Sequence, residues 1–277
     1  MGRHYGRSAP LADEEPCVKL TGERPIEGKT PDSLLALHAA GYREVRARAA
    51  AGTFLDLGCG LGDGTAGFAE PGRTLVGLDY DAPTAIEAER RHADIGLMTV
   101  CSDGAKLALA DDSFDYVCSS HLIEHFVEPW HHASEVARVL APGGTAFFLT
   151  PNKPADFENP YHVYLFDPAD LERTLGRYFS SVTVVGLDAT PHVKADFEKR
   201  RAMARKLLAL DPFGWRHKLP RRWFVALHAA GRRVAYRFMA DEQGQGNSGI
   251  TDAEFFTTDQ IDDSTLVLLA VARKPLL

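Results

Sequence analysis

A glycine-rich segment, Gly58-Cys59-Gly60-Leu61-Gly62-Asp63-Gly64, constrains the fold of this chain more than any other feature. It directly follows the short apolar run 53–57, and residues 64–69 after it can open a helix. Glycine adopts positive φ and lets the backbone approach a ligand closely. In a doubly wound α/β sheet, cofactors bind at the first strand-to-helix crossover. The segment therefore predicts a cofactor pocket at the end of the first strand.

Short apolar runs alternate with helical patterns over most of the chain. They predict strands at 53–57, 74–78, 97–101, 114–119, 145–150, 181–187 and 265–273, and helices at 33–50, 64–69, 83–93, 129–140 and 168–178. Continuous apolar runs are typical of parallel strands that are covered on both faces. The sequence thus predicts an α/β fold, a doubly wound seven-stranded mainly parallel sheet, with a helical insertion before the last strand. We expect an N-terminal arm and cap helix at 1–50, a core from 51–187 plus 264–277, and a basic helical insertion at 188–263, which forms a substrate lobe.

Charge is unevenly distributed along the 277 residues, although the net charge is only −7. The segment 194–237 holds 13 Lys and Arg against three acids, so it carries +10 and the remainder −17. A basic segment of this kind indicates either a helix packed on its domain with a solvated basic face, or recognition of an anionic acceptor or an anionic membrane surface. We expect no nucleic-acid partner, because no RNA-binding motif is present and the net charge is negative. The chain shows no secretory signal, which favours a cytoplasmic location.

Two acids decide between the cofactors that a glycine loop could bind. Residues 62–67 match the G-x-G-x-x-G pattern of nicotinamide enzymes, but the match begins several residues past the strand. Asp56 and Asp63 would place negative charge near a pyrophosphate. S-adenosylmethionine has no phosphate and carries an ammonium and a sulfonium, so it suits these carboxylates better. Asp79, 21 residues after Gly58, ends the second strand and can accept hydrogen bonds from ribose hydroxyls.

Several blocks between residues 53 and 187 together resemble the class I methyltransferases, in the group typified by small-molecule and glycan O-methyltransferases. The matching blocks are 55–62, 76–79, 102–104, 114–121, 124–126 and 138–144. The resemblance implies S-adenosyl-L-methionine as cofactor and a last strand that runs antiparallel between the fifth and sixth. It also implies cofactor contacts from Asp56, Gly58, Cys59, Gly60, Gly62, Asp79, Tyr80, Asp103, Gly104, Ser119 and His121. In the preceding arm, Arg24 or Arg43 could pair with the methionine carboxylate.

The expected reaction is methyl transfer to a hydroxyl of a small molecule, sugar or lipid-linked glycan. A hydroxyl acceptor needs a base. His162, in the loop after the fifth strand, and His121, after the fourth, are the predicted catalytic residues. His125 is expected to be structural, and the pair at 131–132 is expected to be solvated. No grouping has metal-ligand spacing, so no metal is predicted. A non-catalytic module that binds a partner and a nicotinamide oxidoreductase stay open as alternatives.

Overall fold

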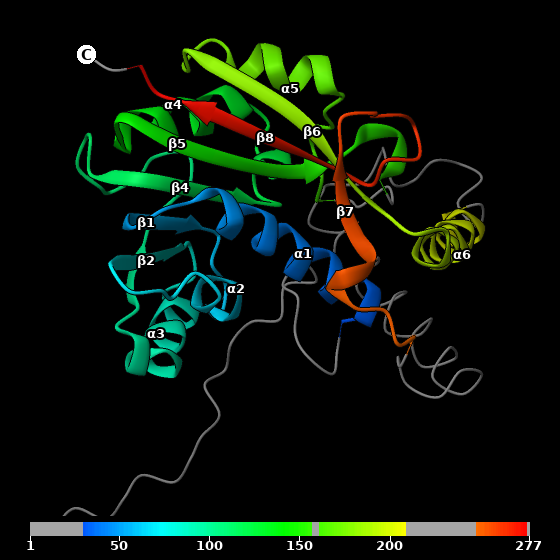
Figure 1. The fold of residues 1–277 in the computed structure, drawn as a ribbon, viewed down its shortest axis with the longest axis horizontal. Coiled ribbons are helices and arrows are strands. Elements are labelled where there is room, and N and C mark those ends of the chain that lie inside the picture. The colour runs from blue at the N-terminus through cyan, green and yellow to red at the C-terminus, as the bar shows by residue number, and fades with distance from the viewer. Residues whose placement is uncertain (1–29, 157–160, 209–247, 276–277) are drawn as a thin grey trace, which may run out of the picture.

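The structure is a computed structural model that describes residues 30–156, 161–208 and 248–275. Figure 1 shows a single mixed sheet with helices packed against it. Its strands are β1 (Gly52–Leu57), β2 (Arg73–Asp79), β3 (Met98–Cys101), β4 (Phe114–Ser120), β5 (Leu140–Pro151), β6 (Ser181–Ala189), β7 (Phe255–Thr258) and β8 (Val267–Arg273). The helices are α1 (Asp32–Arg48), α2 (Asp63–Ala66), α3 (Ala82–Arg91), α4 (Pro129–Val139), α5 (Pro168–Leu175) and α6 (Pro191–Leu208). Short 3-10 turns add η1 (Ala93–Ile95), η2 (Ile123–His125), η3 (Lys153–Ala155) and η4 (Asp252–Glu254).

The strand order is β3-β2-β1-β4-β5-β8-β6-β7. The strands from β3 to β5 are parallel, and β8 lies antiparallel between β5 and β6. The doubly wound α/β fold and the antiparallel last strand are therefore confirmed. The expected number of strands is wrong, because the described sheet has eight strands rather than seven. The additional strand is β7, which pairs with the edge of β6 and lies in the segment assigned to the insertion.

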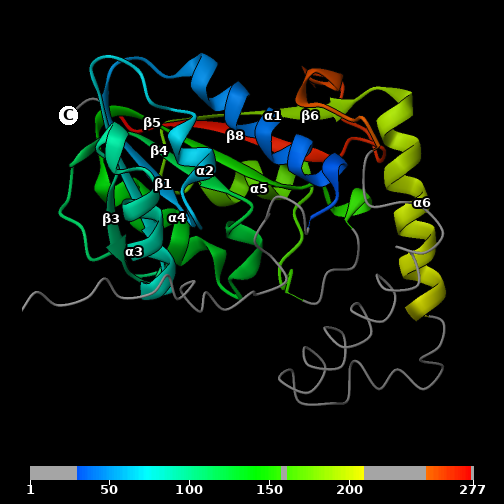
Figure 2. The ribbon, with the colours of Figure 1, turned by 90° about the horizontal axis from the view of Figure 1, so that it is seen from below.

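Alternate residues of each central strand face opposite helical layers, as the two-residue period of a strand requires. Phe54 and Phe147 pack with α1, α3 and α6 on one face. Their neighbours Leu55 and Phe148 pack with α4 and α5 on the other. Figure 2 shows α1 running along one side of the sheet and α6 standing at its far end. Covering both faces explains why the strand sequences are continuously apolar.

Within the described residues, no helix is long and apolar enough to cross a membrane. Of the basic segment 194–237, the described part lies on α6. There Lys194 pairs with Asp188, and Arg200 and Arg201 pair with acids one turn away. The rest of this segment, residues 209–237, lies outside the described residues.

Candidate active site

The glycine loop between β1 and α2 has the positive φ values that its glycines predict. Gly58, Gly60 and Gly62 have φ values of 76°, 57° and 83°, where only glycine is unstrained. The amides of Gly58 and Cys59 donate to the carbonyl of Leu78, at 2.8 and 3.0 Å, which fixes the loop on β2. A Cβ added to Gly60 would meet nothing within 4 Å. The loop therefore presents open backbone to the carboxyl end of the sheet, as a cradle for a ligand would.

Asp56 lies beneath this loop and is completely buried. Its carboxylate accepts hydrogen bonds from Thr65 Oγ1 at 2.5 Å and from Tyr42 Oη at 3.1 Å. Burial raises its pKa to about 7, although the hydrogen bonds from Thr65 and Tyr42 lower it. Asp56 thus connects β1 to both α1 and α2. Tyr42 lies in the predicted arm and cap helix, but no sequence pattern predicts its contact with Asp56.

Asp79 ends β2 with its carboxylate directed at the same loop. Oδ2 accepts from the amide of Gly60 at 3.2 Å, and Oδ1 accepts from the amide of Asp81 at 2.9 Å. Both bonds fix the orientation of the carboxylate, which is almost fully buried. The next residue, Tyr80, exposes 65% of its surface. An oriented acid followed by an exposed aromatic ring suits a ligand with hydroxyls and a flat ring system.

Ser119, Gly104 and His132 form a buried relay between three elements. His132 Nδ1 lies 2.7 Å from the carbonyl oxygen of Gly104, and Nε2 lies 2.8 Å from Ser119 Oγ. Because a carbonyl only accepts, Nδ1 carries the proton and Nε2 accepts from the serine hydroxyl. Burial lowers the pKa of His132 to about 4, so the ring is neutral. The relay ties the segment after β3, which also holds Asp103, to the end of β4.

The expectation that the pair 131–132 is solvated is therefore wrong for His132, which is fully buried. On α4 the buried positions are Pro129, His132, Ala133, Val136, Ala137 and Val139. This spacing of three and four residues is the apolar stripe of a helix, and His132 falls on it. The spacing of these apolar positions can be read from the sequence, and it distinguishes His132 from its exposed neighbour His131.

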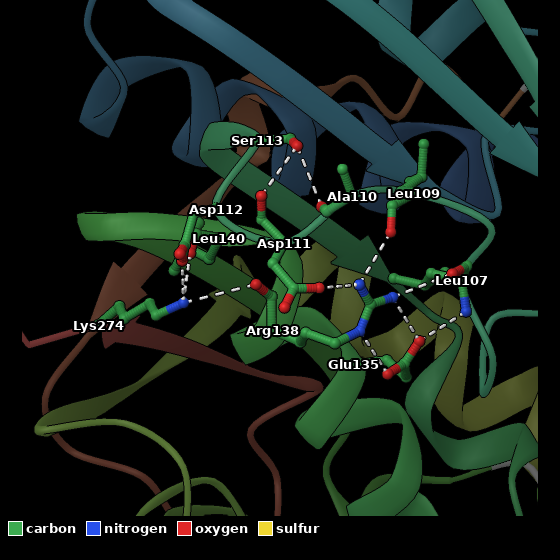
Figure 3. Close-up of polar contacts among 10 residues, drawn as sticks. All are labelled: Leu107, Leu109, Ala110, Asp111, Asp112, Ser113, Glu135, Arg138, Leu140 and Lys274. Atoms are coloured by element: carbon green, nitrogen blue, oxygen red, sulfur yellow. Dashed lines mark hydrogen bonds and ion pairs between the residues drawn. The ribbon is translucent and has the colours of Figure 1, made fainter.

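Arg138, near the end of α4, holds the loop between β3 and β4 in place (Figure 3). Its guanidinium donates to both carboxylate oxygens of Glu135, to Asp111 at 2.6 Å, and to two backbone carbonyls. The carbonyls belong to Leu107 and Leu109, at 3.0 and 2.8 Å. One side chain thus satisfies five acceptors, which only the planar fork of arginine can do. Arg138, the first residue of the block 138–144, therefore acts structurally, by positioning the loop that follows Gly104.

The two predicted catalytic histidines both lie near one buried acid, Glu124. His121 directly follows β4 with φ of 50°, an unusual value outside glycine, and its Nδ1 lies 3.5 Å from Glu124 Oε1. Its ring packs on His38 of α1, with centroids 4.5 Å apart. His162 Nδ1 lies 2.5 Å from Asp156 Oδ1, and its ring is 5.2 Å from that of His125.

The pKa values of Glu124 and His38 show which of these buried groups is charged. Burial would raise the pKa of Glu124, but the contact with His121 and the charges of His125 and His162 lower it to about 2. Burial and the nearby His121 lower the pKa of His38 to about 3. At neutral pH, Glu124 is therefore a buried anion and His38 a neutral ring.

A family model for the methyltransferase domain matches residues 55–148, which include the glycine loop, Asp79, Ser119 and Glu124. A protein of Mycolicibacterium smegmatis, named a probable S-adenosylmethionine-dependent methyltransferase, is 32% identical over 166 residues. The chain is thus similar to S-adenosylmethionine-dependent methyltransferases over this region. The match to the mycobacterial protein covers 57% of this chain and 63% of that one, so the chain spans less than two thirds of that relative.

Solved methyltransferases share the fold of this chain. A methyltransferase from Thermotoga maritima has a TM-score of 0.53 at 13% identity, over 87% of this chain and 91% of that chain. Phosphoethanolamine N-methyltransferase 2 of Haemonchus contortus, solved with S-adenosyl-L-methionine, has a TM-score of 0.52 at 19% identity. The superposition covers 84% of this chain and 52% of that chain. At these identities the likeness establishes the common fold.

Of the two arginines suggested for the methionine carboxylate, the structure describes Arg43. Arg43 donates to Asp252 Oδ2 at 2.9 Å and to the carbonyl of Phe255 at 2.8 Å, so it anchors η4 and β7 to α1. In this structure Arg43 therefore pairs with groups of the protein itself rather than being left open for the methionine carboxylate. Arg24 lies outside the described residues.

Proposed function

We propose that the chain transfers the methyl group of S-adenosyl-L-methionine to a hydroxyl oxygen of a sugar, a lipid-linked glycan or a small natural product. When bound, the cofactor supplies a methyl group on a positively charged sulfur. The observation that carries the proposal is the juxtaposition at the ends of β1, β2 and β4. A glycine loop with open backbone and an oriented acid stand beside a cluster of histidines.

The residues of the glycine loop and of the two following strand ends fit such a cofactor. Gly60, where an added Cβ would meet nothing within 4 Å, would let the backbone contact it closely. Gly58 and Gly62 would shape the loop around it through their positive φ. Asp79 would accept hydrogen bonds from the ribose hydroxyls, and the exposed ring of Tyr80 would cover the adenine. Asp103 is held by the amide of Ala105 at 2.8 Å and would face the adenine amino group.

The remaining expected contacts serve indirectly in this proposal. Asp56 would support the loop from below through Tyr42 and Thr65. Cys59 is buried, so its contribution would come from the backbone. Gly104 and Ser119 would shape the adenine side and the methyl side through His132.

His121 and His162 would serve the acceptor. The acceptor hydroxyl would dock between them, and one of the two rings would take its proton while the oxygen forms its bond to the methyl carbon. The bound cofactor would supply the methyl group, and its sulfur would keep the electron pair of the carbon–sulfur bond. Positioning would supply much of the rate, because methyl transfer is an in-line displacement. A lost general base typically costs 10²–10⁴-fold in turnover.

The charge separation in the sequence supports an anionic acceptor or an anionic carrier. The +10 segment 194–237 would provide the complementary charge, and arginine is the side chain suited to bidentate phosphate contact. A phosphate-linked glycan or an anionic lipid surface has the required chemistry.

Calorimetry with S-adenosyl-L-methionine tests the cofactor assignment. Asp79→Ala should weaken binding at least about tenfold, because hydrogen bonds to a charged acceptor contribute about 1.5–3 kcal/mol each. The matched control is Asp94→Ala, an exposed acid of η1, which should bind as the wild type does. Equal affinity in the Asp79 variant would reject the ribose contact.

Incubation of cell extracts with the protein and methyl-labelled cofactor tests the methyl transfer and identifies the acceptor. The absence of any labelled product would favour a non-catalytic binding module.

A further inference from the structure

We infer that Glu124, His125 and His162 form a binding site for one divalent first-row transition-metal ion. One ligand atom from each of the three residues can be chosen so that all lie within 4.8 Å of one another. Glu124 and His125 belong to η2, directly after β4, whereas His162 comes from the loop before α5. The site is thus assembled from segments that are 37 residues apart in the sequence, which explains why spacing alone gave no metal motif.

The hydrogen bonds of both histidines prepare the rings for a metal. His125 Nδ1 lies 3.0 Å from the carbonyl oxygen of Tyr161, and His162 Nδ1 lies 2.5 Å from Asp156 Oδ1. Both partners are acceptors, so Nδ1 of each ring carries a proton and Nε2 is the atom that would bind a metal. Metal-binding histidines show this arrangement, in which a carbonyl or carboxylate fixes the ring and increases its basicity.

Buried carboxylate oxygens provide an independent indication. Glu124 is fully buried, and its Oε1 has no hydrogen-bond partner among the described residues. The nearest nitrogen of His121, at 3.5 Å, is too far for a strong bond. Asp156 Oδ2 is likewise buried without a described partner. A buried anionic oxygen without a donor is costly, and a bound cation would satisfy it.

The two segments are held together before any ion binds. The amides of Val163 and Tyr164 both donate to the carbonyl of Glu124, at 2.9 and 3.1 Å. Thr150 Oγ1 donates to Glu124 Oε2 at 3.1 Å and leaves Oε1 for a ligand. The loop with His162 is therefore docked on the turn that holds the other two ligands, so little order has to be created on binding.

The donor set defines the class of ion. Two imidazoles and one carboxylate suit ions such as Mn²⁺, Fe²⁺, Co²⁺ and Zn²⁺ better than Mg²⁺ or Ca²⁺, which prefer oxygen alone. Three protein ligands leave further positions for an oxygen donor. If the proposed methyl transfer holds, this donor is the acceptor, which would carry oxygens suited to chelation. His162 would then hold the ion, and His121 would be left to take the proton.

Metal binding to the full chain tests the inference directly. The protein is treated with a chelator, dialysed, and titrated with Co²⁺ while its visible absorption is recorded. Bound Mn²⁺ or Zn²⁺ is counted by elemental analysis after equilibrium dialysis. We expect one ion per chain in the wild type. The double variant His125→Ala/His162→Ala should lose the site, and Glu124→Gln should weaken it at least about tenfold.

A supporting and a control variant make the result specific. Asp156→Asn removes only the carboxylate behind His162, and such changes typically weaken metal binding 10–100-fold. The control is His131→Ala, an exposed histidine on α4 next to Glu128, which should bind metal as the wild type does. Circular dichroism checks that each variant is folded, and His162→Gln replaces the double variant if the latter is not.

Equal metal binding by the wild type and the folded ligand variants would overturn the inference. So would the absence of any ion in the wild type. Calorimetry with S-adenosyl-L-methionine on the same preparations separates this outcome from the failure of the proposed function. Loss of metal binding in a variant that still binds the cofactor supports the metal site, whereas a wild type that binds metal but no cofactor rejects the proposed function alone.

Discussion

Replacing Asp56 by asparagine should change how the stability of the protein depends on pH. Asp56 is fully buried, and burial raises its pKa from an ordinary value of 3.8 to about 7. A carboxyl group with a raised pKa in the folded state ionises first in the unfolded chain. Raising the pH through this window therefore stabilises the unfolded chain, and the folded protein loses stability between about pH 4 and pH 7.

The magnitude follows from the two pKa values. One pKa unit corresponds to about 1.4 kcal/mol, so complete ionisation of Asp56 costs the folded state about 4 kcal/mol. Between pH 5 and pH 8 the expected loss is about 2–3 kcal/mol. Asp56→Asn keeps the size of the side chain and one oxygen acceptor for Thr65 or Tyr42, but it cannot ionise. The difference in unfolding free energy should therefore shift by this amount in favour of the variant as the pH rises.

Urea denaturation followed by circular dichroism at pH 5, 6, 7 and 8, without cofactor, measures this difference. Other groups titrate in the same range, among them His132, but they contribute equally to both proteins and cancel. Asp94→Asn, an exposed acid, serves as the control and should show no pH-dependent difference from the wild type. A difference between wild type and Asp56→Asn that stays constant within about 0.5 kcal/mol would refute the reasoning.

Two further substitutions test the supports of the site. Arg138→Lys keeps the charge but loses the fork that satisfies five acceptors, and we expect a loss of about 2–3 kcal/mol, or about 5–10 °C in Tm. Thermal unfolding should show a much smaller effect for Arg173→Lys, which pairs with one exposed acid on α5. Gly60→Ala should cost about 1 kcal/mol of stability because of its positive φ, and should weaken S-adenosyl-L-methionine binding at least about tenfold. Gly96→Ala has the same strain and equally open surroundings, so calorimetry should find its cofactor affinity unchanged; equal affinity in both variants would reject contact at Gly60.

Local patterns predicted the sheet well because they are set by short-range physics. Apolar runs covered on both faces gave the positions of the seven main strands, and the glycine loop followed from the need for positive φ. The eighth strand escaped because β7 has only four residues, Phe255–Thr258, and carries no alternating pattern. Its place in the sheet depends on pairing with β6 and on the contact of Arg43 with Asp252, which no local signal reveals.

In the candidate site, too, some residues can be placed from local sequence patterns and others cannot. Asp79 could be placed from its separation along the sequence from the glycine loop, because the loop and Asp79 belong to one strand–helix–strand unit. The environment of Glu124 could not, because it depends on the path of the loop that carries His162. Tautomers, charges and unsatisfied oxygens arise from contacts between distant segments. The sequence therefore named the histidines but could not tell which of them share an acid.

Helix α1 connects the two halves of the site through residues one helical turn apart. Tyr42 reaches Asp56 beneath the glycine loop, and a Cβ on Gly64 would collide with its ring, so it fixes the start of α2. His38, four residues earlier and on the same face, packs its neutral ring on His121 at the end of β4. Because both contacts come from one rigid turn, any shift of α1 moves the support of the cofactor loop together with the acceptor histidine. If the proposed function holds, the relative position of methyl donor and acceptor is thus set by a helix that lies outside residues 55–148, the region matched by the family model.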